Sequence, residues 1–318
     1  MSSPSAKPPP AVGAIDLWLL TVVATWALNF KAAQAAGRLT SGGRLDPRSL
    51  ILLRMMLVVP ALLPLAARLD RRSVRQILTL TRREVALYAL LSFAAIPVNQ
   101  FFFIWGMQHT STIHGALLFA TSPAIAGLLA PLWGNERPNP RVWSSMAIAF
   151  GGVALVVSRS AMAMTGARSD ADPALFGDLL ILLSATGWGV YASGSTAVLA
   201  TRNALEVTAL TMTFGLAWTL VLGGAPLFRD VASGAFAHQS LLGWGGLLYI
   251  AYLGALYGWV VWTVGLARIG PARTMLYQYL VPLLSMVLGL GFFGERLEWR
   301  AMAGAAMILM GVAWGRRG

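Results

Sequence analysis

The sequence predicts an all-α membrane protein with ten transmembrane helices, arranged as two inverted five-helix repeats. Composition is the first reason, because 57% of the 318 residues are hydrophobic and only 11% are charged. Soluble globular domains contain roughly 45–50% apolar and about 25% charged residues, so this chain has too few charges to cover a surface in water. The apolar runs are also continuous rather than alternating, which excludes a transmembrane β-barrel.

A repeated pattern of residues is the second reason. Two positions of the first half recur in the second half at one fixed offset, and six more recur at a slightly shorter offset without an insertion. The pairs are Asp16/Asp178 and Trp26/Trp188, then Gly106/Gly265, Pro123/Pro282, Glu136/Glu295, Arg137/Arg296, Arg141/Arg300 and Gly152/Gly311. Each half contains an odd number of apolar segments, so the second copy must enter the membrane from the opposite face. Inverted repeats of this kind are typical of carriers that work by alternating access.

The ten expected helices correspond to ten apolar segments. A helix that crosses about 30 Å of hydrocarbon needs roughly 20 residues. The first half contains Ala14–Ala36, Pro47–Ala67, Val85–Met107, Thr112–Trp133 and Val142–Val157. The second half contains Leu175–Leu199, Val207–Leu227, Leu241–Val264, Ala272–Phe293 and Trp299–Trp314. The fifth and tenth segments are short, and flanking arginines can compensate by reaching the interface.

These segments divide the chain into four parts. Residues 1–13 are expected to be a disordered cytoplasmic tail, residues 14–158 the first repeat, residues 159–173 an external linker, and residues 174–318 the second repeat. Arginines are concentrated in the loop Arg68–Arg83, so the positive-inside rule places both termini in the cytoplasm. The chain is expected to reside in the inner (plasma) membrane. Loop arginines that orient helices in a lipid bilayer explain the net charge of +12 without a nucleic-acid partner.

Several chemistries are excluded by what the sequence lacks. There is no cysteine, hence no disulfide, thiolate metal site or cysteine nucleophile. His109 and His114 have no second ligand at metal spacing, so neither a metal nor another cofactor is expected. An enzyme of the membrane would cluster His, Asp or Glu near a nucleophile, and no such cluster is found. Glycines spaced four apart at Gly254 and Gly258 fit close helix packing, but they do not establish a homodimer.

The stretch Tyr257–Glu295 closely resembles the EamA-type group of the drug/metabolite transporter superfamily. It combines an aromatic-rich helix, a short turn around Ile269–Ala272 and a Tyr–Leu–x–Pro helix that ends in Gly294–Glu295–Arg296. Trp105–Arg137 has the same frame, and Thr25–Phe30 is similar to that family's first helix.

This resemblance implies a ten-helix, basket-like carrier with its cavity between the two halves. Members of the family move amino acids, nucleotide precursors, sugars or drugs, frequently outward. They often carry a lysine near the position of Gln34, whereas this chain has Lys31 nearly one helical turn earlier.

The acidic residues are informative by their placement. All twelve fall in loops or near helix ends, so no carboxylate is expected near the bilayer centre to relay protons. Asp16 and Asp178 are expected to cap the N-termini of their helices. Glu136 and Glu295 are expected to tie tight turns between helices.

Lys31 and Arg54 are the two basic residues inside apolar segments. One hypothesis is that both snorkel to the outer interface. The other is that they face the cavity and attract carboxylate or phosphate, with water or a partner offsetting the cost of burial. Asn29 and Lys31 lie about 200° apart around an ideal helix, so they cannot both face one cavity unless the helix is distorted.

Polar residues in two further helices indicate a binding surface. Asn99 and Gln100 follow Pro97, which frees a backbone carbonyl and lets the helix bend. Binding is favoured for this pair, with helix–helix packing as the alternative. A stripe along one face of the ninth helix must look inward in lipid. It consists of Thr274, Tyr277, Gln278, Val281 and Ser285.

The candidate substrate-binding residues combine these polar positions with aromatic side chains. They are Trp26, Asn29, Lys31, Asn99, Gln100, Phe103, Trp188, Tyr191, Tyr257, Thr274, Tyr277 and Gln278. Aromatic cavities with a few hydrogen-bonding groups are typical of small-molecule sites. The sequence therefore predicts a secondary active transporter, an exporter, of a small amino acid-like metabolite or organic anion. The alternatives are a multidrug exporter of organic cations, which aromatic rings can hold, and an integral membrane enzyme.

Overall fold

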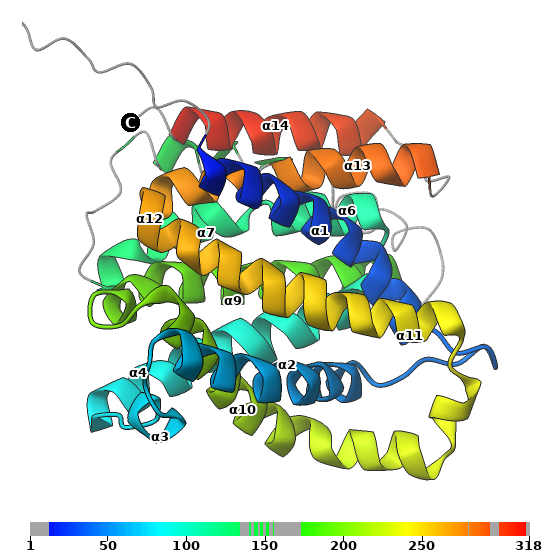
Figure 1. Cartoon of the computed structure of the whole chain (residues 1–318). Helices are drawn as coiled ribbons and strands as arrows, with labels where there is room; N and C mark the ends of the chain where they lie inside the picture. Colours follow the sequence, from blue (N-terminus) through cyan, green and yellow to red (C-terminus); the bar gives the residue numbers. More distant parts are fainter. Residues whose placement is uncertain are drawn as a thin grey trace, which may run out of the picture.

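The computed structural model describes residues 13–133, 140, 143–145, 147–148, 151–152, 155, 173–278, 280–292 and 299–315. This part of the chain is helical and contains no β-strand, only two isolated bridges in loops. Seven of its helical segments are long and apolar enough to cross a membrane. They are Ala14–Gly37, Pro47–Leu69, Arg82–Met107, His114–Trp133, Ala174–Leu199, Ala204–Ala232 and Leu241–Ile269. The chain is thus a multi-pass membrane protein whose long helices lie side by side (Figure 1).

Four predicted helices correspond to single helices of the structure. They are α1 (Ala14–Gly37), α2 (Pro47–Leu69), α9 (Pro173–Leu199) and α10 (Ala204–Ala232). Two short helices lie in loops. They are α3 (Val74–Ile77) and the 3-10 turn η3 (Ala235–His238).

The third, fourth and eighth predicted helices are each built from several pieces. The third consists of α4 (Arg82–Phe93), the π-helical η1 (Ala94–Phe101) and α5 (Phe102–Met107). The fourth consists of α6 (Thr112–Phe119), α7 (Ser122–Leu129) and the 3-10 turn η2 (Ala130–Trp133). The eighth consists of α11 (Leu241–Leu248), the π-helical η4 (Tyr249–Tyr257) and α12 (Gly258–Gln278).

The end of the chain forms α13 (Leu280–Phe292) and α14 (Trp299–Gly315). The fifth predicted helix, Val142–Val157, lies largely outside the described residues, as do Glu136 and Glu295. The total of ten helices and the inverted relation of the two halves therefore stay predictions.

The turn predicted around Ile269–Ala272 is wrong, because α12 continues through these residues to Gln278. The proline ring fixes φ at a value that a helix accepts, and proline lacks only one backbone donor. The Gly270–Pro271 pair therefore favours a break without enforcing one, and the predicted ninth helix begins inside α12.

Short polar side chains define where several helices begin. Asp46 caps α2 by accepting a hydrogen bond from the Arg48 N–H at 2.9 Å. Asn203 caps α10 by accepting from two backbone N–H groups at 3.0 Å. Asp16 accepts from the Gly13 N–H at 2.7 Å, so it stabilises the start of α1 as the sequence predicted.

Asp178 does not cap its helix, contrary to the prediction. Because α9 begins at Pro173, Asp178 lies in its second turn, and its side chain is fully buried. Its carboxylate accepts a hydrogen bond from Thr110 Oγ1 at 2.5 Å and lies 3.4 Å from His114 Nδ1. The residue therefore joins α9 to the fourth predicted helix.

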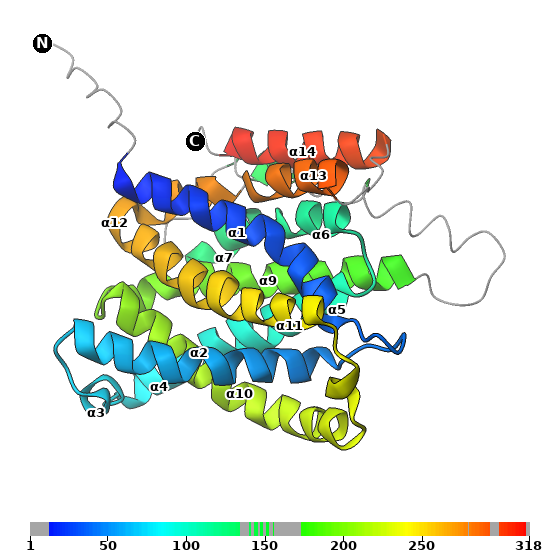
Figure 2. The same ribbon diagram turned by 45° about the vertical axis from the view of Figure 1, so that its right-hand side comes forward.

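The packing places helices of one half against helices of the other. α1 contacts α11, η4, α12 and α13, whereas α9 contacts η1, α5, α6 and α7. α2 packs along α10, and both views show these two helices together at one side of the bundle (Figure 2). Large apolar side chains on the outside are exposed, as expected for contact with lipid. Examples are Leu17, Trp18, Val221 and Leu241.

Candidate functional site

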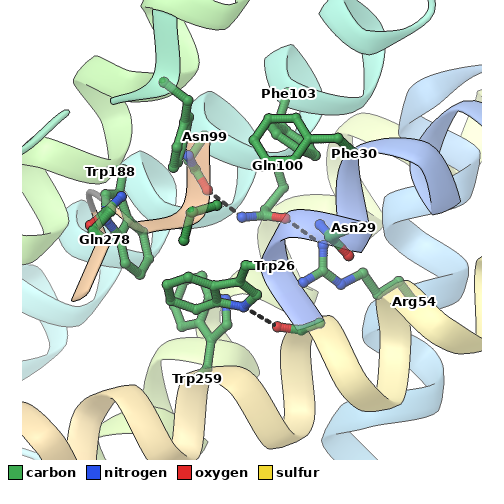
Figure 3. Close-up of a pocket in the computed structure, with 13 residues that line it drawn as sticks. Trp26, Asn29, Phe30, Arg54, Asn99, Gln100, Phe103, Trp188, Trp259 and Gln278 are labelled. Atoms are coloured by element: carbon green, nitrogen blue, oxygen red, sulfur yellow. Dashed lines mark hydrogen bonds between the residues drawn. The ribbon is translucent and has the colours of Figure 1, made fainter. Parts of the chain in front are cut away.

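A cavity lies among α1, α2, η1, α9, η4 and the helices around them, and its empty space, counted together with the open solvent at its mouth, is about 500 Å³. Its walls are formed by Trp26, Asn29, Phe30, Arg54, Asn99, Gln100, Phe103, Phe119, Trp188, Gly254, Trp259, Gln278 and Val281. Figure 3 shows these side chains converging from helices of both halves of the chain.

A chain of buried polar side chains crosses one side of the cavity. Arg54 Nη1 donates to Gln100 Oε1, and Gln100 Nε2 donates to Asn99 Oδ1 (Figure 3). Asn99 Nδ2 then donates to the backbone oxygen of Ser184 at 2.9 Å and to its hydroxyl at 3.0 Å. The chain links α2 and η1 in the first half to α9 in the second. Buried polar groups need such partners, because an unpaired one costs about 1–3 kcal/mol.

A second polar connection holds the opposite side of the cavity. Trp188 Nε1 donates to Gln278 Oε1 at 3.0 Å. Gln278 Nε2 donates to the Ser122 hydroxyl, also at 3.0 Å. This connection fixes the orientation of the Trp188 ring and joins α9, α12 and α7.

Aromatic rings form the rest of the wall. The Trp26 ring packs edge-on against Trp188 with centroids 5.7 Å apart, and Trp188 packs against Trp259 at 5.2 Å. A second group of rings lies at the other end, where Phe30 and Phe103 have centroids 5.2 Å apart. Stacked and edge-to-face rings of this kind make a stiff apolar surface.

Both π-helical segments of the described chain border this cavity. Pro97 in η1 lacks a backbone N–H, and the wider π-helical turn carries the helix past it while placing Asn99 and Gln100 on the wall. In η4 the backbone oxygen of Gly254 accepts a hydrogen bond from Trp26 Nε1 at 3.0 Å. π-helical turns in helices frequently occur at functional sites.

Arg54 contributes the only charge among the described lining residues. Its side chain is 2% exposed, so it does not snorkel to an interface. It makes no ion pair within the described part of the chain. The structure thus separates the two basic residues that the sequence treated together, because Lys31 is outside the cavity lining.

Seven of the twelve candidate residues line the cavity. They are Trp26, Asn29, Asn99, Gln100, Phe103, Trp188 and Gln278. Asn29 lines it and Lys31 does not, as their separation around the helix requires.

Four of the remaining candidates pack beside the cavity or further along α1. Tyr191 is buried behind the wall against the rings of Trp188 and Trp259. Thr274 is fully buried. The hydroxyls of Tyr257 and Tyr277 hydrogen-bond to Thr21 and Asp16 of α1.

Sequence reasoning omitted six lining residues from the candidate set. They are Phe30, Arg54, Phe119, Gly254, Trp259 and Val281. The repeat could have found two of them, because the offset that relates Gly106 to Gly265 also relates Gln100 to Trp259 and Phe119 to Gln278. In the described residues no group of three or more His, Asp or Glu side chains could hold a metal ion.

Comparisons with known proteins place the chain among transporters. The profile of the EamA-like transporter family matches residues 13–158 and 175–314. A protein of Streptantibioticus cattleyicolor named "Probable terminal-alkyne amino-acid exporter" is 26% identical over 299 residues, which are 93% of this chain and 91% of that protein. The uncharacterized transporter YyaM of Bacillus subtilis is 24% identical over 232 residues, 73% of each chain. A crystal structure with 17% identity superposes with a TM-score of 0.63 and covers 96% of this chain and 98% of its own, which shows a shared fold.

Proposed function

Because the chain belongs to the EamA-like transporter family, we propose that it is a secondary active transporter that exports a small metabolite by alternating access. The observation that carries this proposal is the central cavity, whose walls come from α1 and η1 of the first half and from α9, η4 and α12 of the second. A site between two halves can be exposed to either side of the membrane when one half moves against the other.

The two halves are proposed to be inverted repeats. Trp26 and Trp188, which lie at corresponding positions of the repeat, meet in the cavity with centroids 5.7 Å apart. Each also sits on the helix that packs against the opposite half, α1 or α9. A pseudo-two-fold axis through the cavity would produce this arrangement, in which each half contributes one helix that packs against the other half.

The lining favours an amphipathic substrate that carries a negative group. The Trp and Phe rings provide apolar surface, and Arg54 provides the charge. The relative from Streptantibioticus cattleyicolor, which is named as an amino-acid exporter, is consistent with an amino acid-like metabolite or organic anion. An exporter of organic cations is the alternative, since aromatic rings attract cations, but Arg54 would repel them.

Exchange across sealed membranes tests the proposal. Liposomes that contain the purified protein, loaded with unlabelled amino acids and carboxylic acids, should accumulate one labelled member of that mixture from outside. Trp188→Ala should reduce the initial rate about tenfold or more, because it removes an aromatic wall and leaves Gln278 without its indole donor. Binding of a solute without any exchange in liposomes would refute transport.

The orientation is testable because the native chain has no cysteine. Ser41 and Ser73 are both exposed, and they lie in the loops at the two opposite ends of α2. We propose that both termini are cytoplasmic, so an impermeant maleimide should label Ser41→Cys in intact cells and should label Ser73→Cys only after lysis. The opposite labelling pattern would invert the topology.

A further inference from the structure

Arg54 is a buried cation with unused hydrogen-bonding capacity. Its Nη1 donates to Gln100, but its Nε is buried without a hydrogen-bond partner. No hydrogen bond from Nη2 is found within the described residues. A cation held in the membrane interior without an anion costs free energy. A bound anion would offset this cost, which the empty protein does not.

The unused edge of the guanidinium has a specific shape. Nε and Nη2 present two parallel N–H donors, and a carboxylate accepts both through its two oxygens. Gln100 occupies the other side of the group and, through Asn99 and Ser184, ties it to α9. The guanidinium is therefore oriented before a ligand arrives, which lowers the entropic cost of binding.

The same cavity offers little to an ammonium group. None of the described lining residues is Asp or Glu. The amide oxygens of Asn99, Gln100 and Gln278 already accept hydrogen bonds. The Asn29 oxygen is buried without a hydrogen-bond partner and lies against Gly254, where an added Cβ would be 2.5 Å away, so an ammonium group would find one neutral side-chain acceptor there and no carboxylate among the described lining residues. Cation–π contact with the Trp rings would have to compete with repulsion from Arg54.

We propose that Arg54 is the residue that binds the substrate's carboxylate, and that the substrate is an apolar monocarboxylate for which an α-amino group is dispensable. The apolar body of the substrate packs on Trp26, Trp188 and Trp259. This inference rests on the proposed function and defines the substrate class of that same cavity.

Three probes that share a phenyl group separate the contributions of the carboxylate and of the amino group to binding. They are 3-phenylpropionate, L-phenylalanine and 2-phenylethylamine. Binding to the purified full-length protein is measured by quenching of Trp fluorescence and by the rise in Tm that a bound ligand causes. We expect 3-phenylpropionate to bind at least as tightly as L-phenylalanine, and 2-phenylethylamine to cause no shift.

Variants of Arg54 identify the residue responsible. Arg54→Met should weaken 3-phenylpropionate binding about 10- to 100-fold, as expected for loss of hydrogen bonds to a charged group. Arg54→Lys should bind with intermediate affinity, because it keeps the charge and loses the two-donor edge. Arg48→Met is the matched control, since Arg48 is an exposed arginine on the same helix that pairs with Asp46, and it should bind the probes like the native protein.

The Tm of the empty variants distinguishes binding from a structural role. Arg54→Met removes the cost of holding an unpaired charge in the membrane interior, but it leaves the buried Gln100 Oε1 without its donor. These two effects oppose each other, so we expect the Tm of the empty protein to change little. A lowered Tm together with unchanged probe affinity would refute the inference. Arg54→Lys answers the same question where Arg54→Met does not fold.

The remaining outcomes are also decisive. Binding of 2-phenylethylamine as tight as that of 3-phenylpropionate, a requirement for the amino group, or no binding of any probe would each overturn the inference. Transport of a solute at native rates by both Arg54 variants would overturn it and leave the proposed function intact. Carboxylate binding with no exchange in liposomes would leave this inference intact and refute the proposed transport function.

Discussion

Gly187→Ala is expected to destabilise the protein, although alanine is normally the better helix former. Gly187 lies in α9 against the π-helical η1, and an added Cβ would be 2.5 Å from the backbone oxygen of Ala94 and 2.9 Å from the backbone nitrogen of Asn99. Backbone atoms cannot rotate away as a side chain can, so α9 and η1 must separate. Overpacking of this kind costs about 1–3 kcal/mol.

The separation would also damage the cavity. Asn99 holds its position by hydrogen bonds of 2.9 and 3.0 Å to Ser184, which lies one turn before Gly187 on α9. A shift of a few tenths of an ångström between the helices weakens both bonds. We therefore expect Gly187→Ala to lower the Tm and to weaken ligand binding together.

Gly224→Ala is the matched control, because Gly224 lies in α10 and an added Cβ there has no heavy atom within 4 Å. Without a clash, Gly→Ala inside a helix stabilises by roughly 0.5–1 kcal/mol. Thermal unfolding of the two purified variants should therefore give shifts of opposite sign. A Tm for Gly187→Ala that rises as the Tm of Gly224→Ala does would show that α9 and η1 do not approach as closely as described.

Helix positions could be predicted from the sequence because lipid makes hydrophobicity decisive. α1, α2 and α9 begin and end within a few residues of the predicted segments. Pro97 was predicted to bend its helix, and the structure has π-helical turns there. The second π-helical segment, η4, contains no proline and carried no local signal in the sequence.

Two local patterns misled the prediction for a shared reason. The Gly270–Pro271 pair resembles a turn, and Asp178 near the start of an apolar segment resembles a cap. In each case the actual helix boundary lies elsewhere, since α12 ends at Gln278 and α9 starts at Pro173. Glycine and proline disfavour a helix interior by about 1 and about 3 kcal/mol, but tertiary packing can override such preferences. An acidic residue caps a helix only where the helix begins beside it.

Residues of the candidate site could be predicted from the sequence where the repeat or the helical periodicity specifies which face of a helix lines the cavity. Asn29 and Lys31 were both kept as candidates although they lie about 200° apart around an ideal helix, and of the two only Asn29 lines the cavity. Arg54 could not be assigned, because snorkelling and cavity-facing arginines have the same sequence pattern. Its placement depends on the approach of Gln100 from η1, which is a tertiary contact. Tyr257 and Tyr277 instead hydrogen-bond to α1 through their hydroxyls.

Outside the cavity, a cluster of charged side chains joins the two halves near the loop between α2 and α4. Arg202, just after α9, donates from Nε to Glu84 at 2.8 Å and from its Nη atoms to the backbone oxygens of Ile77 and Thr79. It also lies 3.5 Å from Glu206, which is only 1% exposed. Arg72 pairs with the same Glu206 at 2.6 Å. The cluster therefore holds α10 and the linker before it to α3 and α4.

Arg202→Met is expected to lower the free energy of unfolding by about 2 kcal/mol, because it removes the charged hydrogen-bond partner of the partly exposed Glu84 and leaves the buried Glu206 with Arg72 alone. Two carbonyl oxygens of the α3 loop lose their donor as well. Arg83→Met is the control, since Arg83 is exposed and makes no ion pair in the described part of the chain. Surface substitutions usually change stability by less than about 0.5 kcal/mol. Thermal or denaturant unfolding of both variants in the same detergent gives the comparison. If Arg202→Met were as stable as Arg83→Met, the cluster would contribute nothing to holding the halves together, and the junction would depend on apolar packing between α2 and α10.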